Sequence, residues 1–484
     1  MPRHIVHMSD AAAAALRAAL KQLRTELEVP PGFPAPVLAA ADAAAAAPRL
    51  PDEDATHLPF FTIDPPASQD LDQAMYLERR SGGGFRVHYA IADVAAFVTP
   101  GGALDAEAHE RVETLYFPDG KVALHPPVIS EGAASLLPDR TVPALLWRHD
   151  LDADGQVTHS HVGRALVRSR AKLNYAGVQQ AVDAGTAEEP VALLRDIGML
   201  REAVEVARGG ISVSLPDQEV TLEEGSFRLS YRAALPVEGW NEQVSLMTGM
   251  AAARMMLDSG TGILRTQKTA KPDVVTRVRA IAEVLGIDWP HHVSYADLVR
   301  RLDPREQKHA AFLSEATAML LRAEYTPFRD HRVPEHTVHA AIAAPYTHCT
   351  APLRRLIDRY TGELCVAACA GQAPPDWVLT ALYGLPCDMA RGKGGRADRR
   401  SVDLAEAAVL MNRVGEVFDA AVINTDAESG RPQDGMLHLA DPAVLGRVKA
   451  GAGTDLKLGA SVRATLQRAD PGHPGEDKVL FSLP

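Results

Sequence analysis

The spacing of apolar residues changes twice along this 484-residue chain, and the two changes limit the folds that it can adopt. Residues 1–58 are rich in alanine and leucine. Residues 9–29 have a helical pattern that a Ser-Asp pair can cap and two prolines end, and a second helix is expected around Val37 to Ala47. The segment predicts a small helical N-terminal module. A helix-turn-helix is one interpretation, but acidic residues outnumber basic ones, which argues against DNA recognition.

Residues 59–413 show strand patterns first and helical patterns afterwards. The strand patterns include PFFTID, FRVHYAIADVAAFV and PALLWRHDLDADGQV, the last with an Asp-Gly turn. Helical patterns follow at Val191–Arg208, Asn241–Asp258, Lys271–Leu285 and Gln307–Ala323. Strands followed by helices predict an α+β domain with a mixed sheet.

Residues 414–484 alternate polar and apolar residues at strand spacing, with Gly and Asp between the runs. This pattern predicts a five-stranded OB-fold barrel, whose faces and loops commonly bind single-stranded nucleic acid. The expected fold class is therefore α+β, with a helical N-terminal module and a C-terminal OB-fold barrel.

The formal net charge of −12 argues against a protein that coats nucleic acid, although a basic channel can lie inside an acidic chain. The N-terminal residues lack the apolar stretch of a secretory signal, and no run of about 18 apolar residues is present to span a membrane. We therefore expect a cytoplasmic protein with no membrane partner. The four cysteines lack CxxC spacing, which favours reduced thiols over a zinc site.

Three carboxylates, Asp64, Asp70 and Asp72, lie within nine residues in the segment TIDPPASQDLDQ. Like charges this close repel one another unless a cation neutralises them. Oxygen ligands at such spacing suit a hydrated divalent cation, magnesium more than zinc. An acidic surface loop with turn-forming aspartates is the alternative that the spacing leaves open.

Two basic segments are candidates for phosphate binding. Arg354 and Arg355 follow a proline in the segment TAPLRR, and guanidinium groups match phosphate oxygens in pairs. Arg399 lies in the segment RGKGGRADRR, where basic residues outnumber acidic ones. That segment could line the path of a nucleic-acid backbone. Solvated arginines on a helix are the simpler interpretation of either segment taken alone.

Several segments together resemble the RNB family, the catalytic domain of RNase II and RNase R. TIDPPASQDLDQAM is similar to the family's aspartate signature, and the likeness continues through HYAIADVAAFV, LHPPVISEGAASLLPD and SRAKLNY. PYTHCTAPLRRLID is similar to the family's Tyr-x-His-x-Thr-Ser-Pro-Ile-Arg-Arg motif. The matches occur in the family's order between about Pro59 and Arg413, and the family carries an S-one-type RNA-binding domain where this chain has its C-terminal β segment.

The resemblance implies a magnesium-dependent, hydrolytic 3′-to-5′ exoribonuclease that degrades single-stranded RNA to nucleoside 5′-monophosphates, with manganese as a substitute metal. It implies that Asp64, Asp70 and Asp72 hold the metal and that Asp72 also orients or deprotonates the attacking water. Arg354 is then expected to contact the scissile phosphate and stabilise its transition state. No obligate protein partner is indicated.

The resemblance further implies RNA contacts outside the catalytic cluster. Tyr116 and Tyr175 match positions that contact the terminal nucleotides, and stacking on a tyrosine contributes about 1–3 kcal/mol per base. A buried core tyrosine is the alternative for each. Arg355 and Arg399 are the expected contacts to the RNA backbone.

Three departures from the family pattern bear on these expectations. Gln73 stands where the family has a fourth aspartate. Either a metal is bound more weakly or the site uses one ion rather than two, and an inactive RNA-binding protein of the same fold is the alternative. The family's second stacking aromatic is missing near Val220, where Phe227 and Tyr231 are the nearest alternatives. The N-terminal module is also too short and too helical for the two cold-shock-type barrels typical of the family. His348 is expected to shape its loop and not to bind metal.

Overall fold

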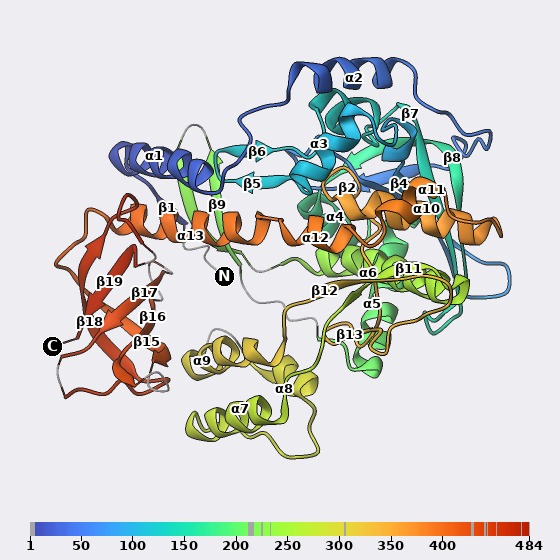
Figure 1. Ribbon diagram of the computed structural model, residues 1–484. Helices are drawn as coiled ribbons and strands as arrows, with labels where there is room; N and C mark the ends of the chain where they lie inside the picture. Colours follow the sequence, from blue (N-terminus) through green and yellow to red (C-terminus); the bar gives the residue numbers. More distant parts are fainter. Residues whose placement is uncertain are drawn as a thin grey trace.

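The computed structural model of the protein describes residues 5–483 apart from 212–216, 224–225, 233, 304–305, 427–429, 440–441, 443, 452 and 476. The described part contains two closed five-stranded barrels. Helix α13 (Gly394–Leu410) runs between the body of the molecule and the C-terminal barrel (Figure 1). The predicted α+β class is confirmed.

The first barrel forms the centre of the body. Its strands follow in the order β2, β3, β4, β7 and β8, with β2 and β8 parallel and the other pairs antiparallel. Small and apolar side chains from all five strands, such as those of Phe60, Ala90 and Leu146, fill its interior. The three strand patterns predicted from the sequence correspond to β2 (Phe60–Ile63), β4 (Phe85–Ala92) and β7 (Thr141–Leu151). Two further strands, β3 (Gln73–Arg79) and β8 (Val157–Leu173), complete the barrel.

Helices cover this barrel, and they form one hydrophobic core with its outward-facing side chains, among them Tyr89 and Trp147. The helix with Gly198 and the helix with Trp240 approach each other closely because Gly198 has no side chain. A Cβ at position 198 would lie 2.3 Å from the Cβ of Trp240. The helices are α4 (Tyr175–Asp183), α5 (Glu189–Arg208), α6 (Pro236–Ser259) and α10 (Leu356–Cys369).

The C-terminal segment forms the predicted OB-type barrel. Its strand order is β15, β16, β17, β19 and β18, and its core includes apolar residues of α13. The strands are β15 (Val417–Asp426), β16 (Arg431–Leu439), β17 (Leu445–Lys449), β18 (Ser461–Ala469) and β19 (Val479–Ser482).

Both predicted N-terminal helices are present, but they pack in different places. Helix α1 (Asp10–Glu26), capped by Ser9, lies against α13, whereas α2 (Ala35–Ala46) packs against α3 (Ala103–Arg111) (Figure 1). Strand β1 also pairs with a later hairpin, forming a sheet of β1 (Ile5–His7), β10 (Ser226–Arg232) and β9 (Asp217–Glu223). The expectation of one helical module is therefore wrong, because each apolar face finds its partner outside residues 1–58.

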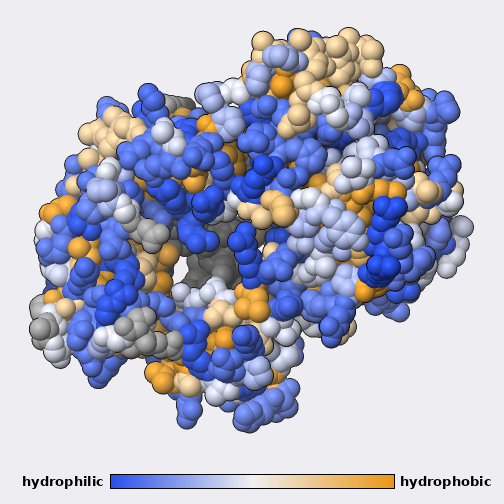
Figure 2. Space-filling view, viewed as in Figure 1, coloured by the Kyte–Doolittle hydropathy of each residue, from blue (hydrophilic) through white to orange (hydrophobic). Residues whose placement is uncertain are grey.

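A second helical group contacts the C-terminal barrel. It consists of α7 (Pro272–Val284), α8 (Tyr295–Arg301) and α9 (Gln307–Ala316), and α9 packs against β15. Helix α9 is shorter than predicted because Leu320 is extended and the chain enters β12 (Glu324–Phe328). Figure 2 shows an opening between this helical group, the C-terminal barrel and the body. No helix in the described ranges is long and apolar enough to cross a membrane.

Candidate active site

The predicted aspartates lie in the loop that joins β2 to β3. Ser135 holds this loop, since its Oγ accepts from the Leu71 amide at 2.9 Å and donates to the Gln69 carbonyl at 2.6 Å. The ammonium of Lys172 donates to the Pro66 carbonyl at 2.7 Å. Backbone groups of the loop are thus bonded to side chains from elsewhere in the body, which fixes the three carboxylates.

Asp72 and Arg354 meet although 282 positions separate them in the chain. The buried carboxylate of Asp72 accepts from the Leu353 amide at 2.8 Å and from Arg354 Nε at 3.2 Å. Burial raises the pKa of Asp72 to about 7, against the opposing effect of Arg354. The Arg354 side chain is 45% exposed, and its terminal nitrogens have no hydrogen-bond partner among the described residues. The guanidinium is therefore held at Nε and free at its outer edge.

Asp64 follows β2 and has one carboxylate oxygen without a partner. Its Oδ2 is buried, and no described residue donates to it. Burial raises the pKa of Asp64 to about 6, and the nearby charge of Asp70 acts in the same direction. A buried acceptor without a donor is costly, so this oxygen marks a place for a ligand.

Asp70 has two partners from one short hairpin, which β5 (Leu115–Phe117) and β6 (Gly120–Val122) form. Lys121 Nζ donates to Asp70 Oδ1 at 2.6 Å, and the Tyr116 hydroxyl donates to Oδ2 at 3.3 Å. The two residues are directly opposite each other in the hairpin and so share a face. The Tyr116 side chain is also 43% exposed, as a base-stacking residue must be.

Gln73 is bonded through its amide nitrogen to the loop that carries Arg354. This nitrogen donates to the carbonyl of Thr350 and so joins the β2–β3 loop to residues 346–355, the arginine loop. A carboxylate at this position could not donate that hydrogen bond. In this chain, position 73 therefore has a structural contact where the family pattern has a charge.

Arg355 is paired inside the protein. Its guanidinium binds both oxygens of Asp358, at 3.0 and 2.8 Å, and Asp358 also accepts from the Ala351 amide at 2.7 Å. This ion pair fixes the arginine loop, so the expected RNA contact at Arg355 is not supported by the geometry. His348 is half-buried, and its Nδ1 lies 2.6 Å from the Tyr325 hydroxyl, so the side chain is bonded within the protein.

The remaining predicted RNA contacts differ in accessibility. Tyr175 begins α4, is half-buried, and has its pKa raised to about 12 by burial and by the charge of Asp64. Arg399 is exposed on α13 and has no partner in the described part of the chain. Phe227 is wrong as a stacking alternative, since it is fully buried beside α1. The side chain of Tyr231 lies outside the described residues.

The carboxylates fit a loosely coordinated cation better than a closed cage. Within the described ranges, no group of three or more His, Cys, Asp or Glu is arranged to hold a metal ion. Asp72 is bonded to Arg354, whereas Asp64 has a free oxygen and Asp70 Oδ2 has only the Tyr116 hydroxyl. Magnesium keeps several waters and commonly uses one or two carboxylates, so Asp64 and Asp70 fit such an ion.

Lys121 is the residue of this site that the sequence analysis missed. The available signal was Pro118-Asp119-Gly120, a turn sequence between two short apolar runs. A hairpin around that turn places position 121 opposite Tyr116. The strands have three residues each, too few for the alternation that reveals a strand.

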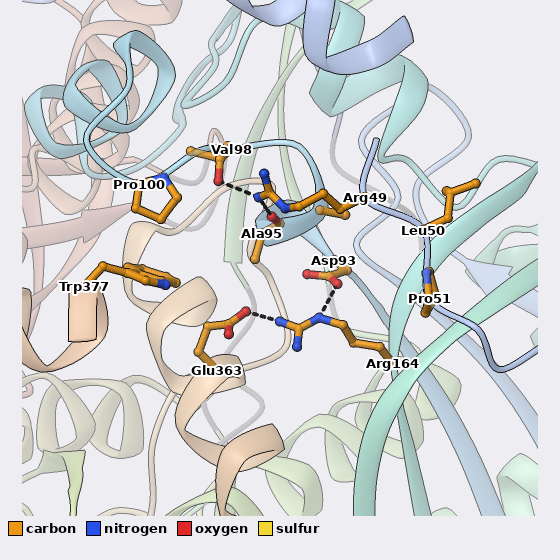
Figure 3. Close-up of a pocket in the computed structure, with 11 residues that line it drawn as sticks. Arg49, Leu50, Pro51, Asp93, Ala95, Val98, Pro100, Arg164, Glu363 and Trp377 are labelled. Carbon is orange, nitrogen blue, oxygen red and sulfur yellow. Dashed lines mark hydrogen bonds and ion pairs between the residues drawn. The ribbon is translucent and has the colours of Figure 1, made fainter. Parts of the chain in front are cut away.

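A separate cavity of about 360 Å³ lies away from the carboxylates (Figure 3). In it, Arg164 is held between Asp93, at 2.9 Å, and Glu363. Arg49 donates to the Val98 carbonyl at 3.1 Å. The ion pairs of Arg164 thus join β8 to α10, and the cavity is separate from the carboxylate cluster.

Solved structures identify the fold. The apo form of Mycoplasma genitalium RNase R superposes with a TM-score of 0.82 at 17% identity, covering 97% of this chain and 78% of that one. The protein thus has an RNase R-like fold, with a carboxylate and arginine cluster beside its central barrel.

Sequence comparison then gives the family. Residues 52–369 match the family model described as RNB domain, and residues 416–474 match the RNase II-type exonuclease C-terminal S1 domain. The chain belongs to the RNB family.

Two curated relatives differ in what their names report. Ribonuclease R of Escherichia coli is 26% identical over 398 residues, covering 76% of this chain and 48% of that protein. The chain thus spans about half the length of that relative. The protein named Inactive exonuclease DIS3L2 of Arabidopsis thaliana is 41% identical over 133 residues, covering 27% of this chain and 12% of its own length.

Proposed function

We propose that this protein is a magnesium-dependent, hydrolytic 3′-to-5′ exoribonuclease that releases nucleoside 5′-monophosphates from single-stranded RNA, with manganese as a substitute metal. The observation that carries the proposal is the contact between Asp72 and Arg354 beside Asp64 and Asp70. A positively charged guanidinium with a free outer edge next to metal-binding carboxylates suits phosphodiester hydrolysis. The likeness to Escherichia coli ribonuclease R supports the same class of reaction.

Each residue of the cluster has a distinct task in this proposal. Asp64 and Asp70 would hold the divalent ion, which when bound lowers the pKa of water and neutralises phosphate charge. Asp72 holds Arg354 through Nε, so that the terminal nitrogens bind two oxygens of the scissile phosphate. The remaining lone pairs of Asp72 orient the attacking water, which requires the ionised carboxylate.

The RNA would be held by contacts that ignore its sequence. The exposed ring of Tyr116 stacks on a terminal base directly above Asp70, and Tyr175 supports the nucleotide from the side of Asp64. Arg399 contacts the backbone farther from the reacting phosphate. The opening seen in Figure 2 is the proposed entry for a single strand. A solved structure of Mycoplasma genitalium RNase R in complex with ribose methylated single-stranded RNA supports this class of substrate.

Digestion of a 5′-labelled single-stranded RNA oligomer with magnesium tests the proposal. The wild-type protein is expected to produce a ladder of shortening labelled products, and Asp72→Asn is expected to lose it. An oligodeoxynucleotide of the same sequence is the control for the 2′-hydroxyl. RNA that stays intact with both magnesium and manganese would contradict the proposal.

An RNA-binding protein without catalysis is the second candidate. Gln73 favours it, because an amide bonded to the Thr350 carbonyl replaces the family's fourth carboxylate. The relative from Arabidopsis thaliana named as an inactive exonuclease is a further reason to consider it. Equal RNA affinity of the wild type and Asp72→Asn, with no cleavage by either, would establish this alternative.

A further inference from the structure

Lys121 occupies a position within the carboxylate cluster that is suited to a bound cation. Its Nζ lies 2.6 Å from Asp70 Oδ1 and 3.0 Å from Glu131 Oε1. The Asp70 and Lys121 side chains are only 10% and 25% exposed, so water screens this pair weakly. The ammonium therefore neutralises Asp70 at the oxygen that a second metal ion would otherwise bind.

The hairpin that carries Lys121 is fixed at its tip. Arg24 of α1 donates to Asp119 Oδ2 at 3.1 Å, and its guanidinium stacks over the Phe117 ring at 4.2 Å. Glu131 also binds the ammonium, at 3.0 Å. Moving Lys121 away from Asp70 thus requires breaking a second ion pair or displacing the hairpin.

Like Lys121, Gln73 makes the cluster less negative, because an amide stands where the family pattern has a carboxylate. With an amide at position 73 and the Lys121 ammonium on Asp70, the cluster has too little negative charge for two divalent ions close together. The free oxygen of Asp64 and the Oδ2 oxygen of Asp70 still provide ligands for one ion.

We propose that Lys121 is a resident cation of this site, which takes the place of a second metal ion at Asp70 and limits the protein to one divalent ion. The inference rests on the proposed function, because it concerns the same cluster. Its test counts ions in the absence of RNA, so it can fail or succeed independently of cleavage.

Titration of the full chain with Mn²⁺ alone, with free Mn²⁺ measured by electron paramagnetic resonance, gives the number of ions bound. Ions on the acidic surface are subtracted with the double variant Asp64→Asn/Asp70→Asn. The wild type is expected to bind one ion at the site, and Lys121→Met is expected to bind two. Lys121→Arg keeps the charge and is expected to bind one. Lys21→Met, an exposed position on α1, is the matched control with the same loss of charge.

Two ions in the wild type would overturn the inference, and this result does not depend on the folding of any variant. One ion in a folded Lys121→Met, checked by circular dichroism, would overturn it as well. RNA digestion by the same preparations separates the two proposals. One ion without cleavage would refute the proposed activity and leave the role of Lys121 standing.

Discussion

At the scale of single residues, some side chains of the site could be predicted from the sequence, whereas others are placed there only by the fold. Asp64, Asp70 and Asp72 were predictable because their proximity is local in sequence. Asp72 and Arg354 are 282 positions apart, and only the family resemblance placed both in one site; their direct contact was not predicted. The pairing of Arg355 with Asp358 was not anticipated, because tandem arginines give no sign of which guanidinium is already neutralised.

Replacing Arg354 with lysine should greatly reduce turnover. Lysine keeps the positive charge but loses the Nε bond to Asp72 and the paired donors for a phosphate. By analogy with the loss of one donor that stabilises transition-state charge, kcat should fall about 10²–10³-fold. Thermal stability should change little, because the Arg354 side chain is 45% exposed. Arg254→Lys, at an exposed position on α6, should retain wild-type kinetics. Unchanged turnover in Arg354→Lys would contradict the assigned role.

Activity should fall as the pH is lowered through neutrality. Burial raises the pKa of Asp72 to about 7 and that of Asp64 to about 6, so both carboxylates become protonated on the acid side. A bound cation favours the ionised form, so it can only move the midpoint to lower pH. Single-turnover cleavage between about pH 5 and about pH 8, with saturating magnesium, measures this dependence. A rate that rises toward acid pH would contradict it.

The same two groups affect stability with the opposite sign. Because their folded pKa values lie above the ordinary value of about 4, the folded protein binds more protons than the unfolded chain between about pH 4 and about pH 7. Their contribution to stability is therefore greatest on the acid side of this interval and is lost as the pH rises through it.

At the scale of elements, periodicity predicted helices and strands but not their partners. The alanine pattern of residues 10–26 correctly indicated a helix, yet its apolar face packs on α13 and on residues of the β5–β6 hairpin. Nothing local in an alanine-rich helix specifies such distant contacts. The hairpin escaped prediction because its strands are short, although it carries Tyr116 and Lys121 to the site.

Removing the α1 contact to this hairpin should impair catalysis from a distance. Arg24→Ala loses the bond to Asp119 and the stacking on Phe117, so Tyr116 and Lys121 would be held less firmly over Asp70. We expect kcat to fall several-fold with a smaller change in KM, and Arg24→Lys to restore part of the loss. Lys21→Ala, exposed on the same helix, is the control. Steady-state kinetics give kcat, and thermal melting gives the stability. A lower melting temperature with an unchanged kcat would show that α1 has a purely structural role.

At the scale of the whole molecule, α13 and the α7–α9 group connect the central barrel to the C-terminal barrel by two routes. The opening in Figure 2 lies between these routes. The division of the chain into an α+β body and a terminal OB-type barrel followed from the change in apolar spacing. The contact between α9 and β15 could not be predicted in this way. Each element has an ordinary amphipathic pattern, which does not specify its partner.

The measurement that tests the central claim most directly is the digestion of one single-stranded RNA, labelled in parallel at its 5′ end and at its 3′ end, with magnesium present. A 3′-to-5′ exonuclease should release the 3′ label at once as a mononucleotide while the 5′-labelled strand shortens step by step. Fragments of intermediate length that keep the 3′ label, or release of the 5′ label first, would contradict the account.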